Sequence, residues 1–387
     1  METITHALAD RYQFHFIGIG YKGPVINGPV SIYPCNLNGG DVYGAYQLKQ
    51  RIRDLQPDLV FLLNDIWMFQ NYAAVCATEA LTLPFIAYAA IDGKIVDPTT
   101  IKDLSFLKHL VAYTDFARHE LKHAFQCSDQ YTRASTPKLS VIGHGVDVTT
   151  FYPLPDRAAL KRKWFPQLSD PENTFLVLNA NRPQPRKRVD LTIQAFAKFC
   201  QDKPANVLLY LHHAVMNEAE KAQIENEVKQ AAISDRVILS PIAMESVDDC
   251  AMNELYNACD VGINTAMGEG WGLVSMEHAA TRRAQIVPKH SACEEIWQGI
   301  AECVAVRRVY VPKFSMLELA EVSVASAAHS LEKLYQDRAY RETLAIRCYE
   351  HVTQAAYHWP HIAQQWDTVF TTAIAAQARY PADTYKA

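Results

Sequence analysis

The chain lacks the features that mark several large classes of protein. No apolar run approaches the roughly 20 residues that a membrane-spanning helix needs, and the first eight residues lack the basic and apolar regions of a secretory signal. No polybasic stripe is present, which argues against a nucleic-acid partner. The 9 cysteines are scattered without a Cys-x-x-Cys pair, which argues against a disulfide framework or a zinc site. These absences predict a cytoplasmic protein with no bound metal.

The chain has 387 residues, of which 49% are apolar and 20% charged, and its net charge is -5. This length exceeds one ordinary core and predicts two domains. Strand-like and helix-like segments alternate, which favours a parallel α/β architecture. Strands are expected at 12–17, 58–63, 84–88, 108–113, 139–142, 174–178, 205–211, 236–239, 261–264 and 284–287. Helices are expected at 3–9, 43–55, 116–125, 189–199, 218–232, 249–259, 274–280, 316–335 and 339–354.

A segment rich in turn residues spans residues 143–155. It contains Gly143-His-Gly-Val-Asp147 and then Phe151-Tyr-Pro-Leu-Pro155, and such a stretch is typical of a domain boundary. We therefore predict one domain over residues 1–148 and a second over 149–358. Residues 359–387 begin near Pro360, which suits the first turn of a helix, and are expected to form a terminal helix.

Two acids frame a glycine-containing string, Glu269-Gly-Trp-Gly-Leu-Val-Ser-Met-Glu277. A predicted strand precedes this string and a predicted helix follows it. Glycine lets backbone N–H groups approach a ligand closely, and a helix start offers unpaired N–H groups to a phosphate. The carboxylates can accept hydrogen bonds from sugar hydroxyls. The string predicts a sugar-nucleotide site; a structural alternative is an exposed loop acid followed by a Glu that the helix dipole favours.

Several segments together resemble the retaining glycosyltransferases of group 1 (family 4-like). They are the string from Glu269 to Glu277, the boundary segment, and the terminal segment 357–366. A fourth is Asn179-Ala-Asn-Arg-Pro-Gln-Pro-Arg-Lys-Arg-Val-Asp190, which is similar to the family's Gly-Arg-x-x-x-x-Lys loop. The resemblance implies an α/β chain with the GT-B fold. In that fold two Rossmann-like domains face a central cleft, and a C-terminal helix crosses back to the first domain.

The resemblance also implies roles for individual residues. Glu269 would contact the donor hexose and Glu277 the ribose of the nucleotide. Arg182 and Lys187 would bind the diphosphate and stabilise charge on the leaving group. Arg188 replaces the family's Gly and is expected to make the loop more basic; a solvated basic loop is the alternative. The backbone between the two acids would hold the hexose and diphosphate through Gly270, Trp271, Gly272, Leu273 and Val274.

The first domain departs from the family in two ways. Asp92 stands where many members have a His, so it is a candidate for a sugar-binding or catalytic role, and Asp65 is a weaker one; Asp before Gly is also a common turn pair. The family's first strand and its Gly-rich loop are not found before the helix expected at 3–9. A misassigned start, a substitute segment near Gly39-Gly40, or a loss of activity would each explain this.

The resemblance implies a retaining, metal-independent enzyme that moves a hexose from a nucleoside diphosphate sugar to a sugar or lipid-linked acceptor. No Asp-x-Asp is present to hold a metal, and no cofactor beyond the donor substrate is expected. No charge asymmetry signals peripheral membrane contact. A different class, a catalytically weak sugar-nucleotide-binding or scaffold protein, would be consistent with the departures in the first domain.

Three motifs point elsewhere and carry less weight. His119-Glu120-Leu-Lys-His123 matches a zinc-protease helix, but Lys122 is a poor neighbour for a dication and no third ligand is evident. Residues 18–23 match Gly-x-Gly-x-x-Gly, yet the prolines and glycines that follow prevent the helix that a dinucleotide site requires. The pair at 212–213 is better explained as polar residues at a strand end than as metal ligands.

Overall fold

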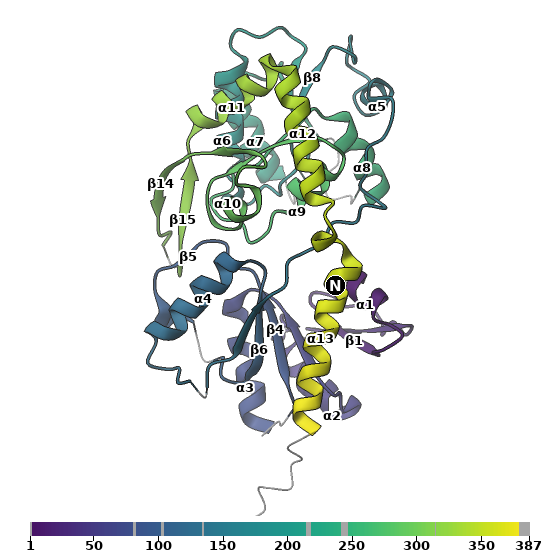
Figure 1. Cartoon of the computed structure of the whole chain (residues 1–387), viewed down its shortest axis with the longest axis vertical. Coiled ribbons are helices and arrows are strands. Elements are labelled where there is room, and N and C mark those ends of the chain that lie inside the picture. The colour runs from purple at the N-terminus through teal and green to yellow at the C-terminus, as the bar shows by residue number, and fades with distance from the viewer. Residues whose placement is uncertain are drawn as a thin grey trace, which may run out of the picture. The chain divides into compact units, whose positions relative to one another are not determined.

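The computed structural model describes residues 2–79, 83–101, 104–133, 135–213, 218–240, 247–313 and 315–378. Within these ranges the chain forms two compact units. The first holds the chain up to residue 91, residues 95–144, and the C-terminal segment from residue 359. The second holds residues 92–94 and 145–358. Figure 1 shows the elements of both units.

The second unit is built on a parallel sheet with the strand order β10-β9-β8-β11-β12-β13. Every pair in it is parallel, and every residue of β8, β9 and β12 is buried. Continuous apolar strands of this kind are expected where helices cover both faces of a sheet. The strands are β8 (Phe175–Asn179), β9 (Val207–Leu211), β10 (Val237–Leu239), β11 (Val261–Ile263), β12 (Ala284–Pro288) and β13 (Glu302–Val304).

The strand order of this sheet is the doubly wound order 3-2-1-4-5-6. The α-helices of this unit are α5 (Arg157–Trp164), α6 (Val189–Cys200), α7 (Glu218–Gln230), α8 (Asp249–Ala258), α9 (Leu273–Ala280), α10 (Ser291–Trp297), α11 (Val324–Gln336) and α12 (Arg338–Val352). Short polar residues cap several of them: Asp248 accepts from the N–H of Ala251, and Asp337 from that of Tyr340. Such caps satisfy N–H groups that a helix start leaves unpaired.

A buried ion pair fixes α5 to this sheet. Lys161 Nζ lies 2.8 Å from Asp260 Oδ2, and both side chains are less than a tenth exposed. Arg157 lies 2.6 Å from the other carboxylate oxygen, and the N–H of Leu176 donates to Asp260 at 2.9 Å. These contacts hold the pKa of Asp260 well below its usual range, although burial opposes them.

The helix expected over residues 316–335 is wrong in its first part. Residues Leu317–Val322 form strand β15, which pairs antiparallel with β14 (Val306–Tyr310), and β15 also neighbours the short strand β5 (Lys94–Ile95). Helix α11 begins only at Val324, where the side chain of Ser323 accepts from the N–H of Ser326. The segment Leu317–Val322 reads Leu-Glu-Leu-Ala-Glu-Val, which does not alternate strictly between apolar and polar residues, so its pattern did not distinguish a strand from a helix.

The first unit contains a parallel sheet with the order β3-β4-β6-β7. Strands β1 (Phe14–Gly18) and β2 (Val30–Pro34) pair with each other in parallel as a separate sheet. The expectation that the family's first strand is missing stays a prediction. The remaining elements are α1 (Glu2–Ala7), α2 (Ala45–Leu55), β3 (Val60–Leu63), η1 (Ile66–Met68), α3 (Gln70–Glu79), β4 (Phe85–Ala89), η2 (Pro98–Thr100), β6 (Leu107–Ala112), α4 (Asp115–Cys127) and β7 (Lys138–Val141).

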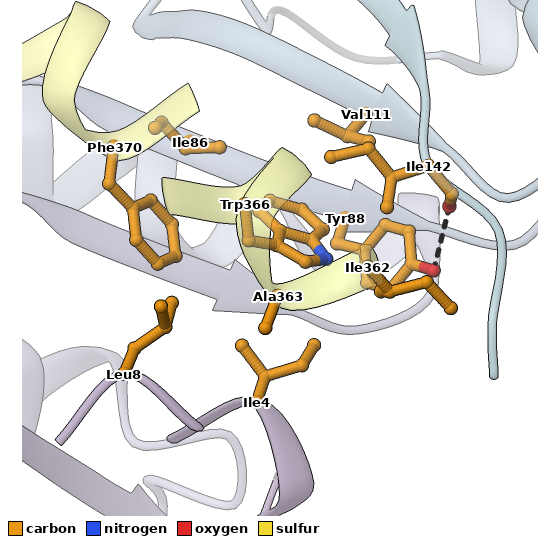
Figure 2. Packing of buried hydrophobic residues seen from close by; sticks show 10 residues of the cluster. All are labelled: Ile4, Leu8, Ile86, Tyr88, Val111, Ile142, Ile362, Ala363, Trp366 and Phe370. Atoms are coloured by element: carbon orange, nitrogen blue, oxygen red, sulfur yellow. Dashed lines mark hydrogen bonds between the residues drawn. The ribbon is translucent and has the colours of Figure 1, made fainter. Parts of the chain in front are cut away.

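The C-terminal helix α13 (Trp359–Ala378) forms part of the first unit's core, as Figure 2 shows. Trp366 is fully buried, and its ring lies 4.8 Å from that of Tyr88 and 4.9 Å from that of Phe61 in edge-on contacts. Ile4 of α1 belongs to the same cluster, and the Tyr88 hydroxyl donates to the Ile142 carbonyl at 2.8 Å. The helix is therefore anchored by aromatic packing. None of the helices described in the structure is long and apolar enough to span a membrane.

Candidate active site

The candidate site is formed by two loops of the second unit that follow neighbouring strands. Residues 180–188 follow β8, and residues 264–272 follow β11. The strand order reverses between these two strands. Ligands of open α/β sheets bind outside the carboxyl ends of the strands at such a switch point. The position of the loops is therefore one where this architecture holds ligands.

Hydrogen bonds join the two loops. The N–H of Met267 donates to the carbonyl of Arg186 at 2.8 Å. The hydroxyl of Thr265 donates to the carbonyl of Arg188 at 2.8 Å, and it also lies 2.7 Å from the hydroxyl of Thr192 on α6. These contacts fix the backbone of both loops, and therefore the positions from which their side chains extend.

The joined loops bring Lys187 and Glu269 into contact. Lys187 Nζ lies 2.5 Å from Glu269 Oε2, and the Asn264 amide lies 3.4 Å from the same oxygen. The exposed fractions of the two charged side chains are 13% and 9%. A partly buried pair of this kind is less screened by solvent than a surface pair, so it provides a cation and a carboxylate with defined positions.

Arg182 occupies the same loop but does not share the burial of Lys187. Its side chain is exposed, and its carbonyl accepts a hydrogen bond from the N–H of Gln184 at 2.8 Å. Arg182 is therefore exposed to solvent, and its role toward a phosphate stays a prediction.

The glycine-containing segment leads directly into helix α9. Gly272 has φ +94°, a left-handed conformation that glycine adopts without strain, and α9 begins at Leu273. Gly270 and Trp271 are buried, whereas Leu273 is exposed and Val274 half-buried. The Trp271 ring lies 5.9 Å from the ring of Tyr357. A helix start leaves its first N–H groups without helical partners, so those of α9 are candidates to bind an anion; the N–H of Ser275 already donates to the carbonyl of Gly272 at 3.1 Å.

Glu277 lies in α9 and is half-buried. The Tyr256 hydroxyl, from α8, donates to Glu277 Oε2 at 3.0 Å. Burial raises the pKa of Glu277 to about 7, and the hydrogen bond from Tyr256 acts in the opposite direction. The carboxyl group therefore titrates near neutral pH.

Asp92 lies in the second unit, although most of the preceding chain belongs to the first. Its carbonyl accepts a hydrogen bond from the N–H of Glu269 at 3.1 Å, and its carboxylate lies 3.4 Å from Arg186 Nε. A Cβ atom on Gly268 would lie 2.7 Å from the Asp92 carbonyl oxygen, so this close approach requires glycine. Asp65 lies in the first unit, exposed, before η1.

Arg188, expected to make the loop more basic, has its guanidinium held in ion pairs. Arg188 Nη1 lies 2.5 Å from Glu321 Oε2, and its Nη2 lies 2.7 Å from Asp190. Hydrogen bonds from Arg308 and Arg188 lower the pKa of the nearly inaccessible Glu321 to about 2. The Arg188 charge is therefore paired with two carboxylates, and Arg307 and Arg308 share one of them, Glu321. The residue has φ +47°, a left-handed conformation that favours glycine.

The structure contradicts the zinc-protease hypothesis. In α4 the carboxylate of Glu120 is buried and accepts a hydrogen bond from the N–H of Ile95 at 2.8 Å, while His119 and His123 are exposed. The expected general base therefore faces away from the two imidazoles. Among the described residues no group of three or more His, Cys, Asp or Glu side chains is arranged to hold a metal ion. His213 is buried, not loop-facing as expected, and burial lowers its pKa to about 3.

Residues 161–298 match the family described as Glycosyl transferases group 1, and this range contains both loops. The second unit contains a group 1 glycosyltransferase domain. Curated relatives of the chain include the D-inositol 3-phosphate glycosyltransferases of Kineococcus radiotolerans and Geodermatophilus obscurus, each 30% identical, over 176 and 163 residues. These matches cover 44% and 41% of this chain, and only 37% and 34% of the relatives' own length.

Solved structures show that the group 1 domain is part of a chain with the GT-B fold. Sucrose-phosphate synthase from Thermosynechococcus elongatus is similar with a TM-score of 0.74 at 17% identity, over 96% of this chain and 92% of that one. Anabaena HepE in complex with UDP and glucose is similar with a TM-score of 0.65 at 17% identity, over 89% and 86%. The expectation of a GT-B fold is confirmed.

Sequence reasoning missed several residues that build the site of the group 1 domain. Arg186, Asn264 and Tyr256 contact the predicted acids. Ser291, after β12, donates to the carbonyl of Glu269 at 3.2 Å. The ends of the parallel strands β11 and β12 were a usable signal, because Asn264 and Ser291 follow them closely. Nothing in the sequence pairs Tyr256 with Glu277.

Proposed function

We propose that the protein is a retaining, metal-independent glycosyltransferase that moves a hexose from a nucleoside diphosphate sugar to a sugar or lipid-linked acceptor. The observation that carries the proposal is the partly buried contact of Lys187 with Glu269 at the switch point of the sheet. It places a phosphate-binding cation beside an acid that accepts hydrogen bonds from hydroxyls.

The chemistry of transfer assigns a task to each group. The bond between the anomeric carbon and the β-phosphate oxygen breaks, and the acceptor hydroxyl oxygen bonds to that carbon. The proton of the acceptor hydroxyl passes to the released phosphate oxygen. Negative charge grows on the leaving diphosphate, so Lys187, Arg182 and the first amides of α9 stabilise the transition state. Glu269 accepts hydrogen bonds from the hexose, and Glu277 from the ribose.

The proposed donor class draws support from relatives. The Anabaena structure contains UDP and glucose, and a structure from E. coli, similar with a TM-score of 0.70 at 12% identity, contains UDP-2-fluoro glucose. The curated relatives act as glycosyltransferases on D-inositol 3-phosphate by name. For this chain we propose the common element, a nucleoside diphosphate hexose, with UDP-glucose as the first donor to test.

A transfer assay tests the proposal. Purified protein is incubated with UDP-glucose and with the corresponding GDP, ADP and dTDP sugars, against a panel of sugar, sugar phosphate and polyprenyl phosphate acceptors. Each reaction is run with EDTA and with added Mg²⁺. We expect one donor to release its diphosphate only when an acceptor is present, at equal rates with and without metal. NMR of the product should show the anomeric configuration of the donor.

The outcomes separate the proposal from its rival. A product with inverted configuration, or transfer that requires Mg²⁺, would contradict the retaining or metal-independent part. Tight binding of a nucleoside diphosphate sugar with no transfer to any acceptor would favour a sugar-nucleotide-binding or scaffold protein. Lys198→Ala is the control for variants of Lys187 and Glu269, because Lys198 is exposed on α6 outside both loops.

A further inference from the structure

We infer that Arg186 is a positioning residue that holds the carboxylates of Asp92 and Glu269 toward the donor hexose. The inference rests on the proposed function and adds to it a residue outside the two predicted phosphate-binding cations. It also gives Asp92 a place in the site of the second unit.

The Arg186 side chain contacts acceptors from two segments. Its side chain is 30% exposed, and Nη1 donates to the carbonyl of Gly268. Nε lies 3.4 Å from Asp92 Oδ2, and Nη1 lies 3.9 Å from Glu269 Oε1. One guanidinium thus contacts three acceptors that come from two segments far apart in the sequence.

The planar guanidinium suits this set of acceptors. Arginine carries five N–H donors in a rigid plane, whereas lysine carries three on a single nitrogen. The planar group can contact the backbone carbonyl and both carboxylates from opposite edges. The carbonyl of Arg186 also accepts a hydrogen bond from the N–H of Met267 at 2.8 Å, so the base of the side chain is fixed to the loop that carries Glu269.

The adjacent cations Arg186 and Lys187 lie beside different oxygens of Glu269. Lys187 lies beside Glu269 Oε2, and Arg186 beside Glu269 Oε1. Two cations face two acids, so the carboxylates are neutralised without a metal. Each carboxylate oxygen has more than one lone-pair site, which leaves acceptor capacity for hydroxyl groups. Arg186 therefore serves the hexose side of the site, while Lys187 and Arg182 serve the diphosphate.

The experiment compares Arg186→Ala, Arg186→Lys and Arg186→Gln with the control Arg162→Ala. Arg162 is exposed on α5, where its guanidinium lies 3.9 Å from Glu172. For each variant kcat and KM are measured with UDP-glucose, or with the donor that the transfer assay selects, and the affinity for the sugar-free diphosphate is measured by calorimetry. Arg186→Gln keeps a donor for the Gly268 carbonyl and remains informative if Arg186→Ala does not fold.

We expect Arg186→Ala and Arg186→Gln to lower kcat at least about 10-fold while diphosphate affinity changes less than about twofold, because removing a positioning contact weakens the transition state more than ground-state binding. Arg186→Lys should recover only part of kcat. Adding Asp92→Asn to Arg186→Ala should lower kcat little further, since the two residues act as a unit.

Two results would overturn the inference. Unchanged kcat in the Ala and Gln variants would remove the role, and a loss of diphosphate affinity as large as the loss of kcat would make Arg186 a phosphate ligand. Failure of the proposed function has a different signature, because the wild-type protein itself would then bind no diphosphate and transfer no hexose.

Discussion

Lys187 and Glu269 lie 2.5 Å apart although 82 positions separate them in the chain. The contact exists because β8 and β11 are neighbours, so the loops that follow them meet at one edge of the sheet. Each of these groups satisfies the other. A donor that brings a diphosphate for the cation and hydroxyls for the acid can replace this mutual contact without leaving a buried charge unpaired.

Loss of either partner should abolish most of the transfer activity. We expect Lys187→Ala and Glu269→Ala each to reduce turnover at least ~100-fold, the scale of removing one group that stabilises the transition state. Steady-state rates with the selected donor and acceptor measure this. Lys198→Ala should keep the wild-type rate. Near-normal turnover in Lys187→Ala would show that the diphosphate binds elsewhere.

Glu277 should make the stability of the protein depend on pH. Burial raises its pKa from 4.5 to about 7. Between those values the folded protein keeps a proton that the unfolded chain releases, so this group lowers stability as pH rises from about 4.5 to 7. Glu277→Gln should therefore raise Tm by a few degrees at pH 8 and have little effect at pH 4.5. Equal shifts at both pH values would contradict the raised pKa. Glu225→Gln, on an exposed part of α7, is the control.

The buried contact between Lys161 and Asp260 should be costly to break from one side. Lys161→Met leaves the Asp260 carboxylate with Arg157 and the Leu176 N–H as its charged and polar partners. We expect the free energy of unfolding to fall by about 3 kcal/mol, measured by urea denaturation. Lys163→Met, which removes an exposed pair with Glu254, should cost less than about 1 kcal/mol. Comparable losses in both variants would show that burial of the pair has no special weight.

Gly268 should not tolerate a side chain. A Cβ atom there would lie 2.7 Å from the Asp92 carbonyl oxygen and 2.9 Å from a methyl carbon of Leu319. Gly268→Ala must displace the backbone that carries Glu269, so we expect a destabilisation of about 1–3 kcal/mol together with a loss of turnover. Thermal unfolding and the transfer assay measure the two effects. Gly28→Ala, whose Cβ would have its nearest neighbour at 3.8 Å, should be neutral in both.

The fold was largely predictable because its sheet strands are continuous apolar runs separated by helical patterns. The loops after β8 and β11 could be located in the same way. The β14–β15 hairpin was missed because its register depends on contacts such as Arg308 with Glu321, which involve no local pattern. The same holds for Arg188, which pairs with Glu321 133 positions away in the chain, and for Asp92, whose membership of the second unit is a tertiary property.

The most direct test of the account is a thermal-shift panel of UDP, GDP, ADP, dTDP and their common sugar conjugates, run with EDTA on wild-type protein and on Lys187→Ala. A ligand at about 100 times its Kd stabilises a protein by roughly 2.7 kcal/mol. We predict a clear rise in the Tm of the wild type with one nucleotide and its sugar conjugate, and a much smaller rise for Lys187→Ala. No rise with any of these ligands, or equal rises in both proteins, would contradict the site formed by Lys187 and Glu269.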